Sequence, residues 1–159
     1  MAGGVLRIAS GKHTRRAELE AVRQVSLAAL VMLVVQYGLG IILNLYIAVP
    51  ASDAHASLTQ EIASGPLMLT VHALLGLALI GAALVLLVRA VRLEDRVIAV
   101  LAAAGLTAIG GAFASGEIFV RNGQNAASLA MALLTGVALL CYIGALTHVS
   151  AGLRRNGSS

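Results

Sequence analysis

The stretch that decides the fold runs from Leu67 to Val88 and has the sequence LMLTVHALLGLALIGAALVLLV. It contains no Asp, Glu, Lys or Arg, and its polar residues are Thr70 and His72. A helix needs about 20 predominantly apolar residues to cross the hydrocarbon core of a bilayer. Apolar and polar residues do not alternate here with the period of two that is typical of a half-buried strand. The stretch therefore predicts a membrane-spanning helix.

Three further stretches have the same character, at residues 25–49, 97–115 and 126–149. Of the 159 residues, 59% are hydrophobic and 11% are charged, whereas charged residues make up about 25% of a soluble domain. This composition excludes an ordinary soluble enzyme and a disordered chain. We predict an all-α, polytopic membrane protein with a four-helix transmembrane bundle over residues 25–149. An N-terminal arm, 1–24, precedes the bundle, and a tail, 150–159, follows it.

Basic residues are concentrated in the segments that would lie on one side of the membrane. Ten of them precede the first span, join the second to the third, or follow the fourth: Arg7, Lys12, Arg15, Arg16, Arg23, Arg89, Arg92, Arg96, Arg154 and Arg155. The other side has only Arg121. Because cytoplasmic loops carry an excess of Lys and Arg, we expect both termini in the cytoplasm. The basic residues then orient the chain and meet anionic lipid head groups, and no nucleic-acid partner is predicted.

The segment before the first span is expected to stay attached to it as an uncleaved anchor. Its basic region is long, and the apolar run that follows exceeds the length of a signal peptide. Residues 18–24 are expected to extend the first helix into the cytoplasm. The chain is rich in Ala, Leu, Val and Arg and has a single Lys. This usage is typical of GC-rich bacterial genomes, so we expect a bacterial plasma membrane.

The two connections on the predicted outer side differ in length. Residues 50–66 form a long polar loop, in which Ser57 and Gln60 have the spacing of a helix-capping pair. We expect a short helix over residues 57–64 that lies at the membrane interface. Residues 121–125 form a tight turn, so the third and fourth spans are expected to form an antiparallel helical hairpin.

Small residues recur every four positions along the third span. They form two rows: Ala103, Thr107, Gly111 and Ser115, and Ala104, Ala108, Ala112 and Gly116. Small residues let helices approach closely in a bilayer, so we predict that the third span is the central helix of the bundle and the one most surrounded by protein. The predicted helix-packing residues of the third and fourth spans are Gly111, Gly116, Gly136 and Gly144. Alternatively, one row faces a second copy of the chain in a homo-oligomer.

Polar or coordinating side chains gather at one depth, near the predicted outer ends of all four spans. His72 lies about five residues into the second span, and Met131 lies about five residues into the fourth. The other polar residues at this depth are Asn44, Tyr46, Glu117 and Ser128. Such groups are costly inside a bilayer and often mark functional sites. His72 either hydrogen-bonds to Asn44 or Glu117, binds a metal or haem, or exchanges protons with Glu117.

The run His72-Ala-Leu-Leu-Gly76, near the outer start of a helix, resembles the haem-binding helices of four-helix membrane proteins. These include the b-type cytochromes and the halves of haem A synthase. The resemblance covers one helix start and the four-helix layout. In that family, histidines on the second and fourth helices hold haem b near the outer face, which implies that His72 is a ligand. The fourth span has no histidine near its outer end, so Met131 would be the second ligand, since Met/His ligation of haem is known.

Three functions remain open from the sequence. The first is a non-enzymatic accessory or assembly subunit of a larger membrane complex, because no charge pair is embedded in the spans. The second is a haem-b-binding or redox protein that uses His72. The third is an oligomeric channel or transporter, with a polar path along Gln36, Asn44, His72 and Glu117. The single cysteine, Cys141, allows no disulfide within the chain, and no Ser, His and Asp arrangement predicts an enzyme.

Overall fold

The computed structural model of the chain describes residues 2–46, 67–122 and 124–157. They form four helices: α1 (Ala2–Tyr46), α3 (Leu67–Arg92), α4 (Arg96–Asn122) and α5 (Asn125–Gly157). Each of the four contains a stretch that is long and apolar enough to cross a membrane. The predicted all-α class, with four long apolar helices, is therefore confirmed. The predicted loop at 50–66, with its helix at 57–64, lies outside the described residues.

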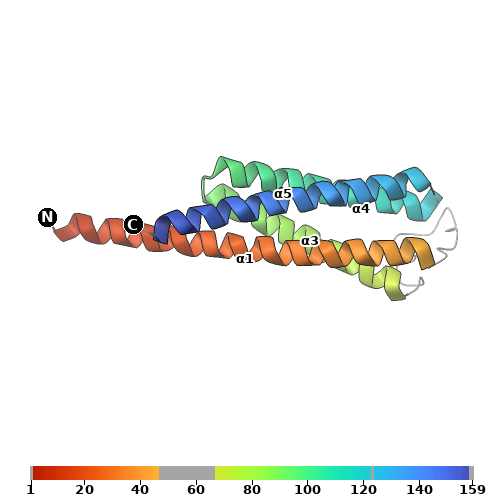
Figure 1. The fold of residues 1–159 in the computed structure, drawn as a ribbon, viewed down its shortest axis with the longest axis horizontal. Helices are drawn as coiled ribbons and strands as arrows, with labels where there is room; N and C mark the ends of the chain where they lie inside the picture. The colour runs from red at the N-terminus through yellow and green to blue at the C-terminus, as the bar shows by residue number, and fades with distance from the viewer. Residues whose placement is uncertain (1, 47–66, 123, 158–159) are drawn as a thin grey trace.

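The helices are longer than the apolar stretches that predicted them. Helix α1 includes the whole segment 2–24, α4 continues past residue 115 to Asn122, and α5 continues past residue 149 to Gly157. Its 45 residues make α1 about 68 Å long, more than twice the thickness of a hydrocarbon core of about 30 Å. Figure 1 shows the N-terminal part of α1 extending beyond the last turn of α5. Hydropathy marks the apolar part of a helix and misses its polar ends.

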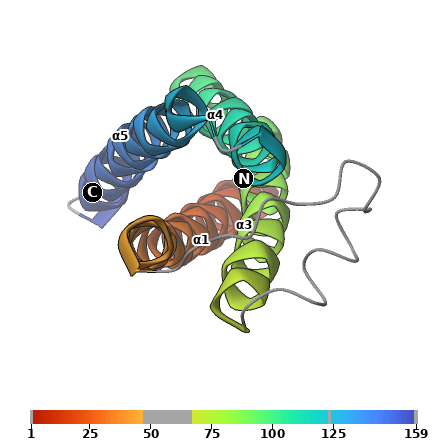
Figure 2. The ribbon, with the colours of Figure 1, turned by 90° about the vertical axis from the view of Figure 1, so that its right-hand side faces the viewer.

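Consecutive helices run antiparallel and form a ring (Figures 1 and 2). Both α1 and α4 pack against α3 and against α5, and the most extensive contact is that between α4 and α5. Each helix therefore occupies one corner of the ring. The predicted central position of the third span is wrong, because α4 has two neighbouring helices like every other member of the ring. The prediction that this span is the one most surrounded by protein is confirmed, since 28% of its apolar stretch is buried inside the bundle, against 17–22% in the other three spans.

The two ends of the bundle differ, and we name them by their connections. The distal end contains Tyr46, Leu67 and the connection between α4 and α5, and the proximal end contains the turn between α3 and α4. Helix α4 ends at Asn122 and α5 begins at Asn125. This short connection, with the packing of α4 on α5, confirms the predicted antiparallel hairpin.

Asp95 closes the turn between α3 and α4 at the proximal end. Its Oδ1 accepts hydrogen bonds from the backbone N–H groups of Val97 at 3.1 Å and Ile98 at 3.2 Å, which is the geometry of a helix N-cap. Glu94, just before it, has a φ of 54°. The second carboxylate oxygen, Oδ2, lies 3.3 Å from Nε2 of His148 on α5. One side chain therefore begins α4 and links the turn to α5.

Other charged pairs at the proximal end lie at the surface of the bundle. Arg89 of α3 pairs with Glu18 of α1 at 3.5 Å, and Arg16 pairs with Glu20 within α1 at 3.3 Å. These side chains are all more than one-third exposed, and exposed ion pairs contribute about 0–1 kcal/mol each. The charges therefore make the proximal end polar but add little to the stability of the bundle.

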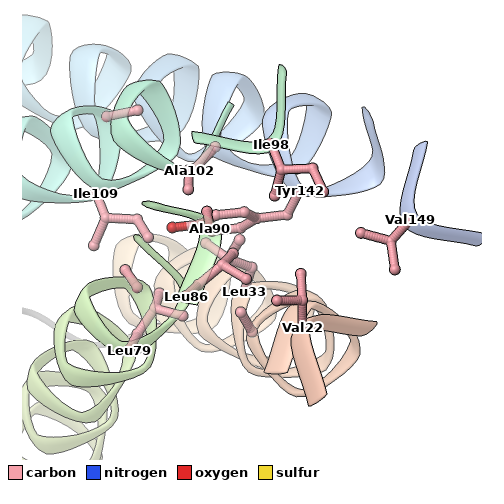
Figure 3. Close-up of a cluster of buried hydrophobic side chains, with 14 of the residues drawn as sticks. Val22, Leu33, Leu79, Leu86, Ala90, Ile98, Ala102, Ile109, Tyr142 and Val149 are labelled. Carbon is pink, nitrogen blue, oxygen red and sulfur yellow. The ribbon is translucent and has the colours of Figure 1, made fainter. Parts of the chain in front are cut away.

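A packed core fills the proximal and middle parts of the bundle (Figure 3). Its largest fully buried side chains include Tyr142, Leu33, Leu86, Ile98, Val22 and Val149. Tyr142 lies across this core against Gly105 of α4. A Cβ atom added to Gly105 would lie 2.8 Å from both Cε1 and Cζ of the Tyr142 ring. Only glycine leaves room for the ring at this position.

Three of the four predicted packing glycines lie against a neighbouring helix, and all three contacts join α4 to α5. An added Cβ would lie 3.1 Å from Leu134 at Gly111, 3.3 Å from the sulfur of Met131 at Gly116, and 3.3 Å from Leu101 at Gly144. A Cβ added to Gly136 would meet no atom within 4 Å among the described residues. The first three glycines therefore account for the close approach of α4 and α5.

Replacing Gly105 with Ala is expected to lower the free energy of unfolding by about 1–3 kcal/mol, the usual cost of overfilling a packed core. The Tyr142 ring is fully buried, so it has no open side to move into. Reversible unfolding of the detergent-solubilised chain in SDS measures this loss. The matched control is Gly110→Ala on the same helix, where an added Cβ meets nothing within 4 Å. Equal destabilisation by the two substitutions would contradict this view of the core.

Candidate functional site

A cavity of about 240 Å³ lies between the four helices in the distal half of the bundle. All four helices line it, over residues 33–43 of α1, 69–79 of α3, 109–120 of α4 and 128–135 of α5. The cavity therefore extends over ten residue steps along α1 and along α3, or about 15 Å. This length is half the thickness of a hydrocarbon core of about 30 Å. Figure 2 views the bundle from this end, where the last turn of α1 and the first turn of α3 lie apart from the adjoining ends of α4 and α5.

The lining of the cavity is mainly apolar. Its floor contains Leu33, Leu79 and Ile109, which also belong to the packed core. The polar side chains in the lining are Gln36, Tyr37, His72, Glu117, Ser128 and Thr135. Apolar pockets with a few placed polar groups are the usual form of small-molecule sites.

The cavity reaches the surface of the bundle. Tyr37 and Ile41 of α1 and Phe113 of α4 line it, and these three residues are also 40–44% exposed. Their rings and side chains therefore stand between the cavity and the surroundings of the bundle. The cavity is therefore bounded in part by side chains that are also accessible from outside the bundle.

Two polar side chains make contacts between α1 and α3 on one wall of the cavity. The Gln36 Nε2 group donates a hydrogen bond to the backbone oxygen of His72 at 2.9 Å. The same nitrogen lies 3.1 Å from the position of a Cβ added to Gly76, and Cε1 of His72 lies 3.5 Å from one added to Gly40. Each polar side chain thus rests on a glycine of the other helix. We call these four residues, Gln36, Gly40, His72 and Gly76, the α1–α3 clasp.

The clasp contains two buried polar atoms without a hydrogen-bond partner among the described residues. These atoms are Oε1 of Gln36 and Nδ1 of His72. Because Nε2 of Gln36 already donates to His72, the amide oxygen is left as an acceptor. An unpaired buried polar atom costs about 1–3 kcal/mol, and most such atoms in native proteins are paired with protein groups or water. The clasp therefore has unused capacity for hydrogen bonds beside the cavity.

The opposite wall of the cavity comes from α4 and α5. The sulfur of Met131 lies over Gly116, and Thr135 Oγ1 donates to the backbone oxygen of Met131 at 2.8 Å. Glu117 pairs with Arg121 at 2.9 Å towards the distal end. The Thr135 hydroxyl and the Glu117 carboxylate are therefore engaged within the chain.

The structure brings four of the predicted site residues to one cavity: His72, Met131, Glu117 and Ser128. His72 on α3 and Met131 on α5 come from opposite corners of the ring. The side chains of Asn44 and Tyr46 lie outside the described part of the chain. The sequence analysis placed Gln36 on a possible transport path with His72 and Glu117 but did not include it among the predicted site residues. The signal that identifies it is the matching spacing of Gln36 to Gly40 and of His72 to Gly76.

Within the described ranges, no group of three His, Cys, Asp or Glu side chains is placed to hold a metal ion. Comparisons with protein families, curated proteins and solved structures found no match to this chain. The function is therefore argued from the geometry of the site itself, an apolar cavity with two unpaired polar atoms on one wall.

Proposed function

We propose that the chain is an integral membrane protein of the bacterial plasma membrane, with both ends in the cytoplasm. Large apolar side chains are exposed on every helix, for example Val31, Leu77, Val100 and Leu140 at 60–71% exposure. A bilayer covers such surface, which water does not favour. The arginines of the proximal end, with Arg121 alone at the distal end, support a cytoplasmic proximal end through the positive-inside rule.

Cysteine labelling tests this orientation in a Cys141→Ala background. A membrane-impermeant maleimide added to spheroplasts should label Gln124→Cys at the distal end and leave Gly157→Cys at the proximal end unlabelled. Both variants should be labelled after the membrane is opened with detergent. Labelling of Gly157→Cys alone in closed spheroplasts would reverse the proposed orientation.

The geometry best supports a binding function for the distal cavity. We infer that the chain holds a small, predominantly apolar molecule there, without converting it. The observation that carries this inference is the cavity itself, which all four helices line and which extends about half the thickness of a bilayer core. Its volume of about 240 Å³ lies just below the roughly 300–1,000 Å³ of typical ligand sites. The ligand is therefore small, and it enters from the membrane beside Tyr37 and Phe113.

A substitution that fills the cavity tests this function. In lipid nanodiscs, the apolar probe 4-octylanisole should shift the NMR signal of the Met131 methyl group saturably, because this side chain lines the cavity. Replacing Ala112 with Phe places a ring in the cavity and should abolish the saturable shift. The matched control is Ala114→Phe on the exposed face of the same helix, which should bind the probe normally. No saturable shift in the unaltered chain, or loss of binding in both variants, would contradict a ligand site here.

A second candidate function is haem b binding, because His72 and Met131 line the same cavity from opposite corners of the ring. The fit is poor, since a haem occupies more than the 240 Å³ available and the helices would have to separate. The purified chain from haem-supplied cells, measured oxidised and after dithionite, distinguishes the two candidates. We expect no Soret band. A Soret band that shifts on reduction, and that His72→Ala removes, would establish haem binding.

The other two functions predicted from the sequence depend on further chains. They are the accessory or assembly subunit of a larger complex and the oligomeric channel or transporter. Both stay predictions. A ligand-binding cavity within one copy is compatible with the accessory role, in which the chain would present or retain its ligand for a partner.

A further inference from the structure

The two unpaired atoms of the α1–α3 clasp define the chemistry of the ligand. Among the lining side chains described, only Gln36 and His72 have a buried nitrogen or oxygen that lacks a hydrogen-bond partner. The side chain of Gln36 contacts the backbone of His72, because its Nε2 donates to the backbone oxygen of His72 at 2.9 Å. Gln36 and His72 therefore lie next to each other on the same wall of the cavity. One polar group of a ligand can form a hydrogen bond with each of the two atoms.

The kind of group follows from the roles of the two atoms. Oε1 of Gln36 accepts only, so the group must donate a hydrogen bond to it. Nδ1 of His72 donates in one tautomer of the neutral ring, so the same group can also accept. A carbonyl cannot donate, and a charged amine or carboxylate would lose its hydration in an apolar cavity. A hydroxyl group both donates and accepts without a charge.

We propose that the cavity binds a lipid-soluble alcohol or phenol, whose hydroxyl group bridges Gln36 and His72 while its hydrocarbon part fills the apolar remainder. The inference rests on the proposed function, because it names the polar group of the ligand held there. In the bridge, the ligand O–H donates to Oε1 of Gln36, and its oxygen accepts from Nδ1–H of His72. The hydrocarbon part lies towards Leu33, Leu79 and Ile109, the apolar floor of the cavity.

The bridge requires a small rotation of the two side-chain ends. Both atoms are covered in the chain as it stands, and the ligand hydroxyl replaces the atoms that cover them. The terminal torsions of Gln and His are broad, so this rotation is accessible. Gly40 and Gly76 permit it, because neither glycine has a side chain that would hold the His72 ring or the Gln36 amide in one position.

A pair of matched probes tests the bridge in the unaltered chain. The probes are 4-octylphenol and its methyl ether, 4-octylanisole, which differ by one methyl group and of which only the phenol can donate from oxygen. Titration in nanodiscs, followed by the Met131 methyl signal and expressed per mole of lipid, should show about tenfold tighter binding of the phenol. The one additional hydrogen bond of the phenol, that to Oε1 of Gln36, provides a difference of about this size. The lipid-based scale corrects for the partition of each probe into the bilayer.

Substitutions in the α1–α3 clasp test whether these residues cause the preference for the phenol over the ether. Replacing Gln36 with Leu should bring the affinity for the phenol down to that for the ether, because only the phenol donates to Oε1 of Gln36, and should leave the affinity for the ether nearly unchanged. Replacing His72 with Phe should weaken the binding of both probes by a similar factor, because the oxygen of either probe can accept from Nδ1–H of His72. Tyr37→Phe removes another hydroxyl of the same lining and should keep the preference for the phenol. A preference for the phenol that survives Gln36→Leu, or unchanged affinities of both probes in His72→Phe, would overturn the bridge.

The outcomes separate this inference from the proposed function. Equal binding of the two probes by the unaltered chain would overturn the hydroxyl bridge, with water as the partner of the two atoms, and would leave the apolar site intact. Binding of neither probe would overturn the apolar site itself. Because the comparison of probes uses the unaltered chain, it does not depend on the folding of any variant.

Discussion

Helices inside a bilayer gain little from burying apolar side chains against one another, because lipid tails are as apolar as leucine. The proposed membrane setting therefore leaves close contact as the main source of attraction between the helices. Glycine provides that contact here. Gly105 leaves room for the ring of Tyr142, and Gly111 and Gly144 leave room for leucines of the facing helix. The extensive packing of α4 on α5, and the solid proximal half of the bundle, depend on these positions.

The same constraint explains why the distal half is hollow. There the larger side chains lie sideways on glycines of a neighbouring helix: His72 on Gly40, Gln36 on Gly76, and Met131 on Gly116. Side chains held against the walls do not fill the centre, so a cavity remains above the floor made by the core. Packing and binding are therefore linked, because the contacts that join neighbouring helices also leave the space between opposite ones.

Much of the fold and part of the candidate site could be predicted from the sequence. The uncharged run from Leu67 to Val88 and its three counterparts predict four helices, and the depth of His72 and Met131 along their spans predicts one shared layer. The register between α1 and α3 could not be predicted, because many alignments of two apolar helices bury similar surface. The hydrogen bond from Gln36 to His72 depends on that register. The prediction of a central position for the third span was wrong for a physical reason. Small residues indicate that another helix approaches closely, but they do not indicate how many helices do so.

The proposed binding function requires the distal half of the bundle to contain an apolar, accessible cavity. Crystals of the unaltered chain grown in a lipidic mesophase and pressurised with xenon test it most directly, because xenon enters dry apolar cavities. We expect xenon density between the four helices, above Leu33, Leu79 and Ile109 and beside Met131. A distal half without xenon, in which side chains of opposite helices touch across the centre, would contradict it.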